Sequence, residues 1–496
     1  MSSKLRSLAS DTLVYGVSTV AGRFLTFLLT PLYTNYLTAS EIGDVTAIYA
    51  AIAFIAVVYS LGLEPAYMRF FEQDNEQRSQ SAFRAAFLGV ALVGTLITIV
   101  TIVTAESVSA SPFLQLGKGG SRLVQIAAFI PLLDALVLIP YARLRMMRQP
   151  GQFALMRLLG IVINVALNAY FLIWLDMHIE GVLWASVITN VLVFLVFVPL
   201  VSLKAAEPVW GIIKGMLRFG LPTVPASFSS IVVMVADRTV MLMLTSSATL
   251  GLYQTNFRLA LPVMMFVTVF EYAFKPFYLQ HRADDDVRLL LSRILTLFTA
   301  VCGLIFLVTA LFMPYAVQLP FVGGKFINPL YWKGLVIIPV VMLAYYFNGV
   351  YINLAAGLHI TMRTWWLPIS TGVAAIVNVV AMLVLVPQMD IMGAAWAKVI
   401  AYAASVIVLS VYARRVYPVQ YDYKKLVITL LTTGVVYGLA VIPELASITG
   451  IIARVAAVPV FILVLAAVGV IRKSLITSAL ALLPGRRNHG TKQHVR

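Results

Sequence analysis

The sequence predicts an all-α integral membrane protein with about fourteen transmembrane helices. Three observations support this fold class. Hydrophobic residues make up 61% of the 496 residues and charged residues only 11%, and the mean hydropathy is +0.94. The apolar residues fall in runs of roughly 20, the length that a helix needs to cross a bilayer core about 30 Å thick. Lys and Arg are concentrated in alternate loops between these runs.

The apolar runs are long enough for each to cross the membrane as one helix. The first run is too long for a removable signal peptide, and no clear cleavage site follows it. Short loops separate the runs and leave no room for a catalytic domain outside the membrane. In chain order the runs lie near 12–36, 42–63, 82–104, 121–146, 153–175, 181–203, 219–244, 250–274, 290–314, 334–357, 364–386, 393–413, 425–442 and 451–472.

The loop charges predict the orientation of the chain. If the N-terminus is cytoplasmic, the inner segments hold 27 of the 36 Lys and Arg residues and the outer loops hold five. Because cytoplasmic loops retain positive charge, we expect both termini in the cytoplasm. The net charge of +16 then reflects topology and contact with anionic membrane lipids, not nucleic-acid binding. Cys302 is the single cysteine, which excludes an intrachain disulfide.

Paired segments reveal an internal repeat. The segments MHIEGVLWASVI, from Met177, and MDIMGAAWAKVI, from Met389, are identical at seven of twelve positions at an offset of 212. Two further matches occur in the same order at a similar offset, GVSTVAGRF with GLPTVPASF and EPAY with KPFY. Each match alone is weak, but the shared order and spacing indicate that one unit occurs twice.

The repeat predicts the domain organisation. We expect two six-helix bundles, residues 1–208 and 209–418, followed by two additional transmembrane helices (419–473) and a basic cytoplasmic tail (474–496). An even number of spans in each half makes the two bundles parallel. Such repeats place a substrate path at their interface, so the organisation predicts a transporter.

Several ionisable residues lie inside the predicted spans or at their ends. A charge at the bilayer centre costs about 3 kcal/mol on insertion scales, so these side chains usually face a cavity or a partner. The candidate site residues are Arg23, Glu64, Asp134, Asp237, Arg238, Arg258 and Lys398.

The deep cations outnumber the deep carboxylates. Arg23, Arg258 and Lys398 stand against one clearly central carboxylate, Asp134. A positive cavity of low dielectric selects an anionic substrate, and arginine offers a planar fork that suits phosphate oxygens. We therefore expect these three cations to bind substrate. For each of them the alternative is a snorkelling side chain or a member of a local ion pair.

The other four residues are candidates for gating or coupling: Asp134, Glu64 and the pair Asp237 and Arg238, which closes the seventh run in MVADRTVML. We expect the pair to lie near the outer rim, where each member contacts its own partner across the interface of the halves. Adjacent helical residues point about 100° apart, which disfavours a shared partner. Alternatively, the pair only fixes the depth of the helix, and Glu64 only links two helices.

Other motifs are weak. No P-loop is present, and the acidic and histidine residues of DMHIE (176–180) are explained by a wet turn better than by a metal site. We expect no cofactor, no metal and no catalytic residue, and hence a transport protein rather than an enzyme.

Three segments carry a resemblance to a known family. They are YGVSTVAGRFLTFLLTPLYTNYL with SEIG (15–43), ADRTVMLMLTSSATLGLYQTNFRLA (236–260), and the helix and turn from Asn378 to Gly393 with VPQMDIMGAAWA. On these segments the chain resembles the bacterial polysaccharide flippases, of O-antigen or capsule type, in the multidrug/oligosaccharidyl-lipid/polysaccharide exporter superfamily. The similarity covers nearly the whole chain, in order, although its motifs are degenerate.

The resemblance implies two six-helix bundles around a cavity that opens alternately to the two sides of the membrane. It also implies an undecaprenyl-diphosphate-linked oligosaccharide as the substrate, with glycosyltransferases or a polymerase of the same pathway as further partners. Arg23 and Arg258 match positions where family members carry arginines in the lumen. Asp237 and Arg238 match a family signature of the same two residue types.

Three alternatives remain open at this point. A cation-coupled multidrug or metabolite exporter and a peptidoglycan lipid-precursor flippase share the expected architecture. A membrane glycosyltransferase or polymerase would need carboxylates or a large outer loop to hold its acceptor, and the longest outer loops, near 105–120 and 315–333, hold one acid, Glu106.

Overall fold

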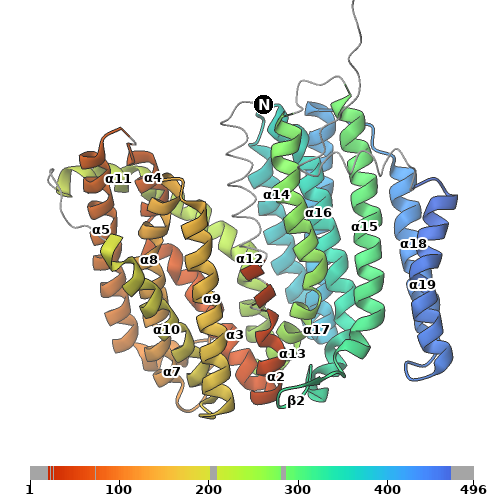
Figure 1. Cartoon of the computed structure of the whole chain (residues 1–496), viewed down its shortest axis with the longest axis horizontal. Coiled ribbons are helices and arrows are strands. Elements are labelled where there is room, and N and C mark those ends of the chain that lie inside the picture. The colour runs from red at the N-terminus through yellow and green to blue at the C-terminus, as the bar shows by residue number, and fades with distance from the viewer. Residues whose placement is uncertain are drawn as a thin grey trace, which may run out of the picture. The chain divides into compact units, whose positions relative to one another are not determined.

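The computed structural model describes residues 21–22, 24–25, 27–72, 74–200, 209–280 and 286–470. Within these ranges the chain is almost entirely helical, as Figure 1 shows, which confirms the predicted all-α membrane fold. The sheet structure of the described residues is limited to one antiparallel hairpin of β1 (Pro320–Phe321) and β2 (Gly324–Lys325).

The helices of the first repeat begin where capping residues precede apolar runs. Thr38 and Glu41 form a capping box at the start of α3, which satisfies backbone N–H groups that a first helical turn leaves without partners. Gly62, with φ of 66°, allows the left-handed turn between α3 and α4. The helices are α2 (Leu29–Tyr36), α3 (Ala39–Ser60), α4 (Leu63–Phe70), α5 (Glu76–Val103), α6 (Ala105–Ser109), α7 (Gly120–Ala127), α8 (Phe129–Met146), α9 (Pro150–Ile173), α10 (His178–Phe197) and the 3₁₀ turn η1 (Val198–Leu200).

The second repeat reuses the same capping chemistry. Ser246 caps α13 by accepting a hydrogen bond from the Thr249 backbone, at an offset of 208 from Thr38. The later elements are α11 (Val209–Gly220), η2 (Leu221–Thr223), α12 (Val224–Leu244), α13 (Ser247–Leu259), α14 (Leu261–Gln280), α15 (Val287–Ala316), η3 (Pro329–Ile337), α16 (Ile338–Ile360), α17 (Trp366–Val416), α18 (Tyr423–Val441) and α19 (Ile448–Ala467).

Ten helices in the described ranges are long and apolar enough to cross a membrane, or up to eleven if the bent pair α13 and α14 is one span. Two predicted spans, 364–386 and 393–413, lie within α17, whose two helical parts meet at a break at Asp390 with φ of 52° and ψ of −131°. Much of the first predicted span, 12–36, lies outside the described residues. The chain is therefore a multi-pass membrane protein, and the count of fourteen remains a prediction.

The chain forms two compact units. Of the described residues, one unit contains those up to Leu261 with Tyr315–Ala344 and Pro368–Ser405, and the other contains Pro262–Pro314, Tyr345–Leu367 and the chain from Val406. These units group residues by packing rather than by repeat, because helices of the second repeat pack on the first. The predicted domain bounds at 208, 418 and 473 remain predictions.

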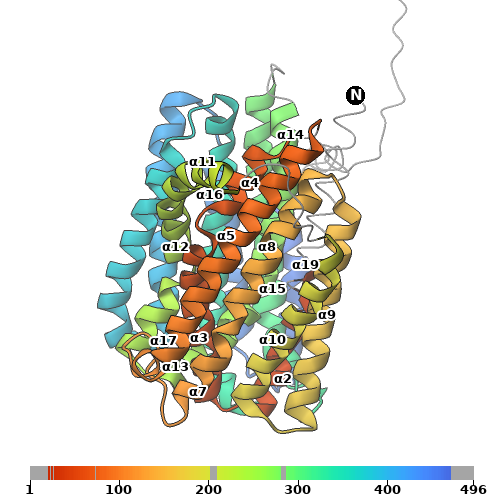
Figure 2. The same ribbon diagram turned by 90° about the vertical axis from the view of Figure 1, so that its left-hand side faces the viewer.

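Each unit has its own apolar core. In the first unit, Tyr59, Tyr67, Phe83 and Met216 are at most 1% exposed and join α3, α4, α5 and α11. In the same unit, α8 packs against α3, α5 and α10, and α9 packs against α10 (Figure 2). In the second unit, Leu307 of α15 meets Phe461 of α19 in a core with helix α18.

Candidate functional site

A cavity of 580 Å³ lies inside the first unit. Its walls come mainly from α8, α9 and α10, with single residues from α2, α3 and α4, and the polar lining side chains recur at helical spacing, which places each set on one helix face. Asp134, Leu138, Tyr141 and Arg145 form the α8 face. The remaining polar lining residues are Tyr49, Glu64, Arg157, Asn164, Ser186, Thr189 and Asn190.

Asp134 contributes a carboxylate to this cavity. It is an exposed residue in the first third of α8, and it lines the cavity wall. Its Oδ1 accepts a hydrogen bond of 2.8 Å from Asn190 Nδ2, and Arg157 is its other electrostatic neighbour. The role of Asp134 in gating or coupling stays a prediction.

Hydroxyl and amide groups continue this polar surface. The hydroxyls of Tyr49 and Ser186 lie 2.5 Å apart, and Asn164 donates to Ser186 at 3.3 Å. Behind them, Tyr33 donates to Asn168 Oδ1 at 2.9 Å. The buried polar groups are thus bonded to one another rather than to lipid, as a membrane interior requires.

The end of the cavity near the turn between α8 and α9 carries the other charges. Glu64 forms an ion pair with Arg145. The guanidinium of Arg145 lies 5.9 Å from the ring centre of Phe153. The guanidinium of Arg157 lies 5.8 Å from the same ring and 5.6 Å from the ring of Tyr141.

The net charge of the cavity lining differs from the positive cavity that the sequence predicts. Among its described lining residues, two guanidiniums and two carboxylates are present, so the lining as a whole is not positive. The carboxylate Asp134 lies 11 residues before Arg145 on α8, about 16 Å along the helix. Along α8 the cavity lining is therefore acidic toward one end, at Asp134, and basic at the other end, at Arg145.

Two of the three cations predicted to bind substrate are not among these lining residues. Arg23 lies outside the described residues. Arg258 does not line the cavity, but the Tyr33 and Tyr49 hydroxyls and Arg238 are its electrostatic neighbours. Within the described part of the chain, no carboxylate forms an ion pair with Arg258.

The third predicted cation, Lys398, is neutralised. Its Nζ lies 2.5 Å from Oδ2 of Asp237, and the two side chains are 8% and 5% exposed. The Tyr253 hydroxyl donates to the same carboxylate at 3.5 Å, and the Lys398 ammonium lies 4.9 Å from the ring centre of Phe257. In this conformation Lys398 is not available to an anion.

The ion pair of Asp237 with Lys398 also differs from the prediction that Asp237 contacts a partner across the interface of the two halves. Asp237 of α12 and Lys398 of α17 both belong to the second repeat, so the contact does not cross between the repeats. The reason is local packing, which brings α17 against the carboxylate. Arg238 is half-buried and has Asp237 and Arg258 as electrostatic neighbours, with no ion pair to it in the described ranges.

The two repeats meet where α3 crosses α13. A Cβ atom at Gly43 would lie 1.8 Å from the carbonyl oxygen of Ser247, and one at Gly251 would lie 1.9 Å from the carbonyl oxygen of Ala39. Each glycine therefore faces the backbone of the other helix without space for a side chain. Both helices start at the predicted outer side, so we name this contact the outer seam.

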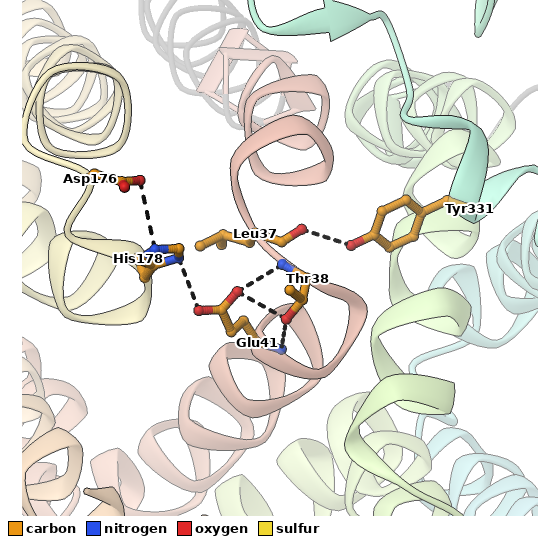
Figure 3. Close-up of polar contacts among 6 residues, drawn as sticks. All are labelled: Leu37, Thr38, Glu41, Asp176, His178 and Tyr331. Carbon is orange, nitrogen blue, oxygen red and sulfur yellow. Dashed lines mark hydrogen bonds and ion pairs between the residues drawn. The ribbon is translucent and has the colours of Figure 1, made fainter.

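Hydrogen bonds from the second repeat extend the outer seam to the turn after α2. The Tyr331 hydroxyl donates to the carbonyl of Leu37 at 3.1 Å (Figure 3). Asn35 Nδ2 donates to the carbonyl of Lys325 at 2.7 Å, and Asn256 Nδ2 donates to the carbonyl of Tyr331 at 3.0 Å. The first two bonds join the repeats at the predicted outer side, and the third holds Tyr331 against α13.

Figure 3 also shows the turn that contains Asp176 and His178. The His178 ring lies between Glu41 at 3.1 Å and Asp176 at 3.7 Å. Glu41 at the same time completes the capping box with Thr38. The turn thus ties the start of α10 to the start of α3.

Sequence reasoning missed several residues of this site, chiefly Arg145, Arg157 and Asn190. Arg157 stands near the end of its span and was grouped with the loop charges that set orientation. A signal was present: Phe153, Arg157 and Asn164 recur at intervals of four and seven residues, which places them on one helix face.

Residues 34–328 match the family described as polysaccharide biosynthesis protein, which is more than half of the chain. The chain belongs to this polysaccharide biosynthesis family. The match confirms the predicted resemblance to the polysaccharide branch of the exporter superfamily. No relative among curated proteins matches the sequence.

Solved structures similar to this family member are membrane transport proteins. The lipid II flippase MurJ, in an inward closed conformation, has a TM-score of 0.70 at 14% identity, covering 90% of this chain and 98% of that chain. An inward-facing multidrug resistance MATE transporter of the MOP superfamily has a TM-score of 0.64 at 15% identity, covering 79% and 94%. Identity this low shows a shared fold. Family and fold together indicate a membrane flippase or exporter.

Proposed function

We propose that the protein moves undecaprenyl-diphosphate-linked oligosaccharide across the bacterial cytoplasmic membrane for the assembly of cell-surface polysaccharide. The observation that carries the proposal is the polar cavity of 580 Å³ within membrane helices, with two arginines at one end. Guanidinium groups suit a diphosphate, and hydroxyl and amide groups such as those of Ser186 and Asn190 suit sugar hydroxyls. Membership of a polysaccharide biosynthesis family supports this substrate class.

The proposed mechanism is alternating access between the two repeats. The outer seam at Gly43 and Gly251 closes the predicted periplasmic end, so the substrate enters from the predicted cytoplasmic end. Opening the other side requires the two helices to separate at the seam. Both termini are cytoplasmic in this arrangement, and the enzymes that build the lipid-linked oligosaccharide are its expected partners.

The charged groups divide into three proposed roles. Asp134 exchanges a coupling proton or cation, because it is the cavity carboxylate away from the basic end. Glu64 holds Arg145 when no substrate is bound. The pair Asp237 and Lys398 fixes the packing of α12 on α17 during the transport cycle, and Arg258 contributes positive potential beside Tyr49.

One observation favours a second candidate. Asp134, which accepts from the Asn190 amide and lines the cavity beside hydroxyl groups, also suits a cationic small molecule, which would make the protein a cation-coupled exporter. The two candidates differ in the sign of the substrate charge, and a transport measurement separates them.

The test is transport by the purified full-length protein in proteoliposomes. A lipid-linked oligosaccharide with a diphosphate is placed in one leaflet, and its appearance in the other is followed with a membrane-impermeant sugar-oxidising reagent. Flipping well above that of protein-free vesicles is expected. Transport of a cationic dye in the same vesicles, without flipping of the lipid, would replace the proposal with the second candidate.

A further inference from the structure

Arg157 has an environment that prepares it for an anion. It lies on α9 seven residues after Pro150, about 10 Å from that helix end. Its side chain is exposed and lines the cavity. The guanidinium lies over the rings of Tyr141 and Phe153, and no carboxylate in the described ranges forms an ion pair with it.

The two rings orient this guanidinium without neutralising it. A cation over an aromatic face is attracted by the ring, and this holds the side chain in place. The N–H groups of a guanidinium lie in its plane, so stacking on a face leaves them free for a further acceptor. A side chain that is already ordered loses less entropy when a ligand binds.

Arg145 brings a second guanidinium to the same place. It lies 5.9 Å from the ring centre of Phe153, the ring that also contacts Arg157. Two cations near one ring repel each other, and among the described residues Glu64 forms its ion pair with Arg145 and not with Arg157. An anion between the two guanidiniums would relieve this repulsion and gain two charge-assisted contacts.

We propose that Arg157 and Arg145 form a phosphoryl-binding site at the basic end of the cavity, and that its ligand is the diphosphate of the lipid-linked substrate. The proposal rests on the proposed function. A diphosphate offers oxygens on two phosphorus atoms, which matches two separate guanidinium forks. On binding, the diphosphate takes the place of the Glu64 carboxylate at Arg145.

The rest of the cavity determines how far the headgroup enters. Asp134 lies about 16 Å from Arg145 along α8 and is an electrostatic neighbour of Arg157, so its negative charge repels a diphosphate that moves past Arg157. The neutral groups between them, including Asn164 and Ser186, are then free to contact the first sugar. The volume of 580 Å³ is typical of a small-molecule site, so the remaining sugars of a long oligosaccharide stay outside this cavity.

The site is tested by binding to the purified full-length protein in detergent. The probes are undecaprenyl diphosphate, undecaprenyl monophosphate and undecaprenol, with inorganic diphosphate as a competitor. We expect the diphosphate lipid to bind at least tenfold more tightly than undecaprenol. Competition by inorganic diphosphate shows that the anion itself is recognised, and no preference among the three lipids would overturn the proposal.

Variants locate the site. Arg157→Gln is expected to weaken binding of undecaprenyl diphosphate at least tenfold, and Arg157→Lys to recover part of the loss, because the charge remains and the fork does not. Phe153→Leu removes the ring and should weaken binding several-fold. The matched control is Arg148→Gln, an exposed arginine in the adjacent turn, which should bind like wild type. Equal binding by the Arg157→Gln variant and wild type would overturn the proposal.

The experiments distinguish a failure of the phosphoryl-binding site from a failure of the proposed transport function. Gel filtration and thermal unfolding first establish that each variant is folded. If wild-type protein flips the lipid-linked oligosaccharide and the Arg157→Gln variant flips it equally well, the site is wrong and the function stands. If wild-type protein binds the diphosphate lipid through Arg157 but does not flip it, the site stands and the function is wrong.

Discussion

Lys398 occupies in the second repeat the position that Ser186 occupies in the first. Ser186 contacts Tyr49 of α3, and Lys398 contacts Phe257 of α13. Tyr49 and Phe257 occupy matching positions in the two repeats. Ser186 lies 2.5 Å from the Tyr49 hydroxyl, and the Lys398 ammonium lies 4.9 Å from the Phe257 ring centre. The same position thus carries a neutral hydroxyl in one repeat and, paired with Asp237, an ammonium in the other.

The buried pair predicts a large effect on stability. Lys398→Met leaves the Asp237 carboxylate buried without its cation, which should cost about 3–5 kcal/mol. The double variant with Asp237→Asn should regain most of this loss, because no charge is left unpaired. Denaturant unfolding of the purified protein measures both values.

The matched control for this prediction is an exposed pair. Lys425→Met breaks the contact of Lys425 with Asp422, whose side chains are 31% and 39% exposed, and should change stability by less than about 1 kcal/mol. An equal effect of Lys398→Met and Lys425→Met would show that the buried pair has no special structural role.

The outer seam predicts that a single methyl group disturbs closure. Gly43→Ala or Gly251→Ala places a Cβ within 2 Å of backbone oxygen, so α3 and α13 must move apart. We expect flipping to fall at least tenfold and cysteines near Thr38 or Ser246 to become more accessible to a water-soluble thiol reagent. Gly434→Ala on α18 is the control, since its added Cβ meets no atom within 4 Å. Unchanged labelling in both seam variants would contradict this role.

Asp134 is predicted to couple transport to an ion gradient. Asp134→Asn keeps the size of the side chain and removes its charge. We expect the variant to bind undecaprenyl diphosphate at least as tightly as wild type, because a repelling charge is removed, while its flipping no longer responds to an imposed proton or sodium gradient. Flipping in proteoliposomes is measured with and without each gradient. A response equal to that of wild type would assign coupling to another residue.

Glu64 is predicted to compete with the substrate for Arg145. Glu64→Gln removes the carboxylate that pairs with this arginine. The variant should bind undecaprenyl diphosphate several-fold more tightly, and it should flip the lipid more slowly because release is hindered. Glu72→Gln serves as the control, since Glu72 pairs with Arg78 at an exposed position. Weaker binding by the Glu64→Gln variant would contradict the proposal that the diphosphate replaces the Glu64 carboxylate at Arg145.

The sequence predicted those features that depend on neighbouring residues. Apolar runs identified α5, α9 and α15 because a bilayer requires about 20 apolar residues in each span. The break at Asp390 within α17 falls in the turn predicted between the runs 364–386 and 393–413, three residues after Pro387. Asp134 was recognised because a carboxylate in mid-span is costly.

Contacts between distant residues could not be read from spacing. Asp237 and Lys398 are 161 residues apart, and only the packing of α12 on α17 brings them together. Arg157 was assigned to topology because its aromatic partners, Tyr141 and Phe153, reach it through the fold. The balance of charge in a cavity depends on which side chains share its wall, which a count along the chain does not give.

The crossing of α3 and α13 has a consequence for the ancestry of this fold. Gly43 faces the residue four positions before Gly251, and Gly251 faces the residue four positions before Gly43. A contact in which each member meets the counterpart of the other is isologous, the kind that joins the two subunits of a symmetric dimer. A single ancestral six-helix bundle could thus have paired with its own copy through one glycine, and fusion of two genes would have preserved that dimer within one polypeptide.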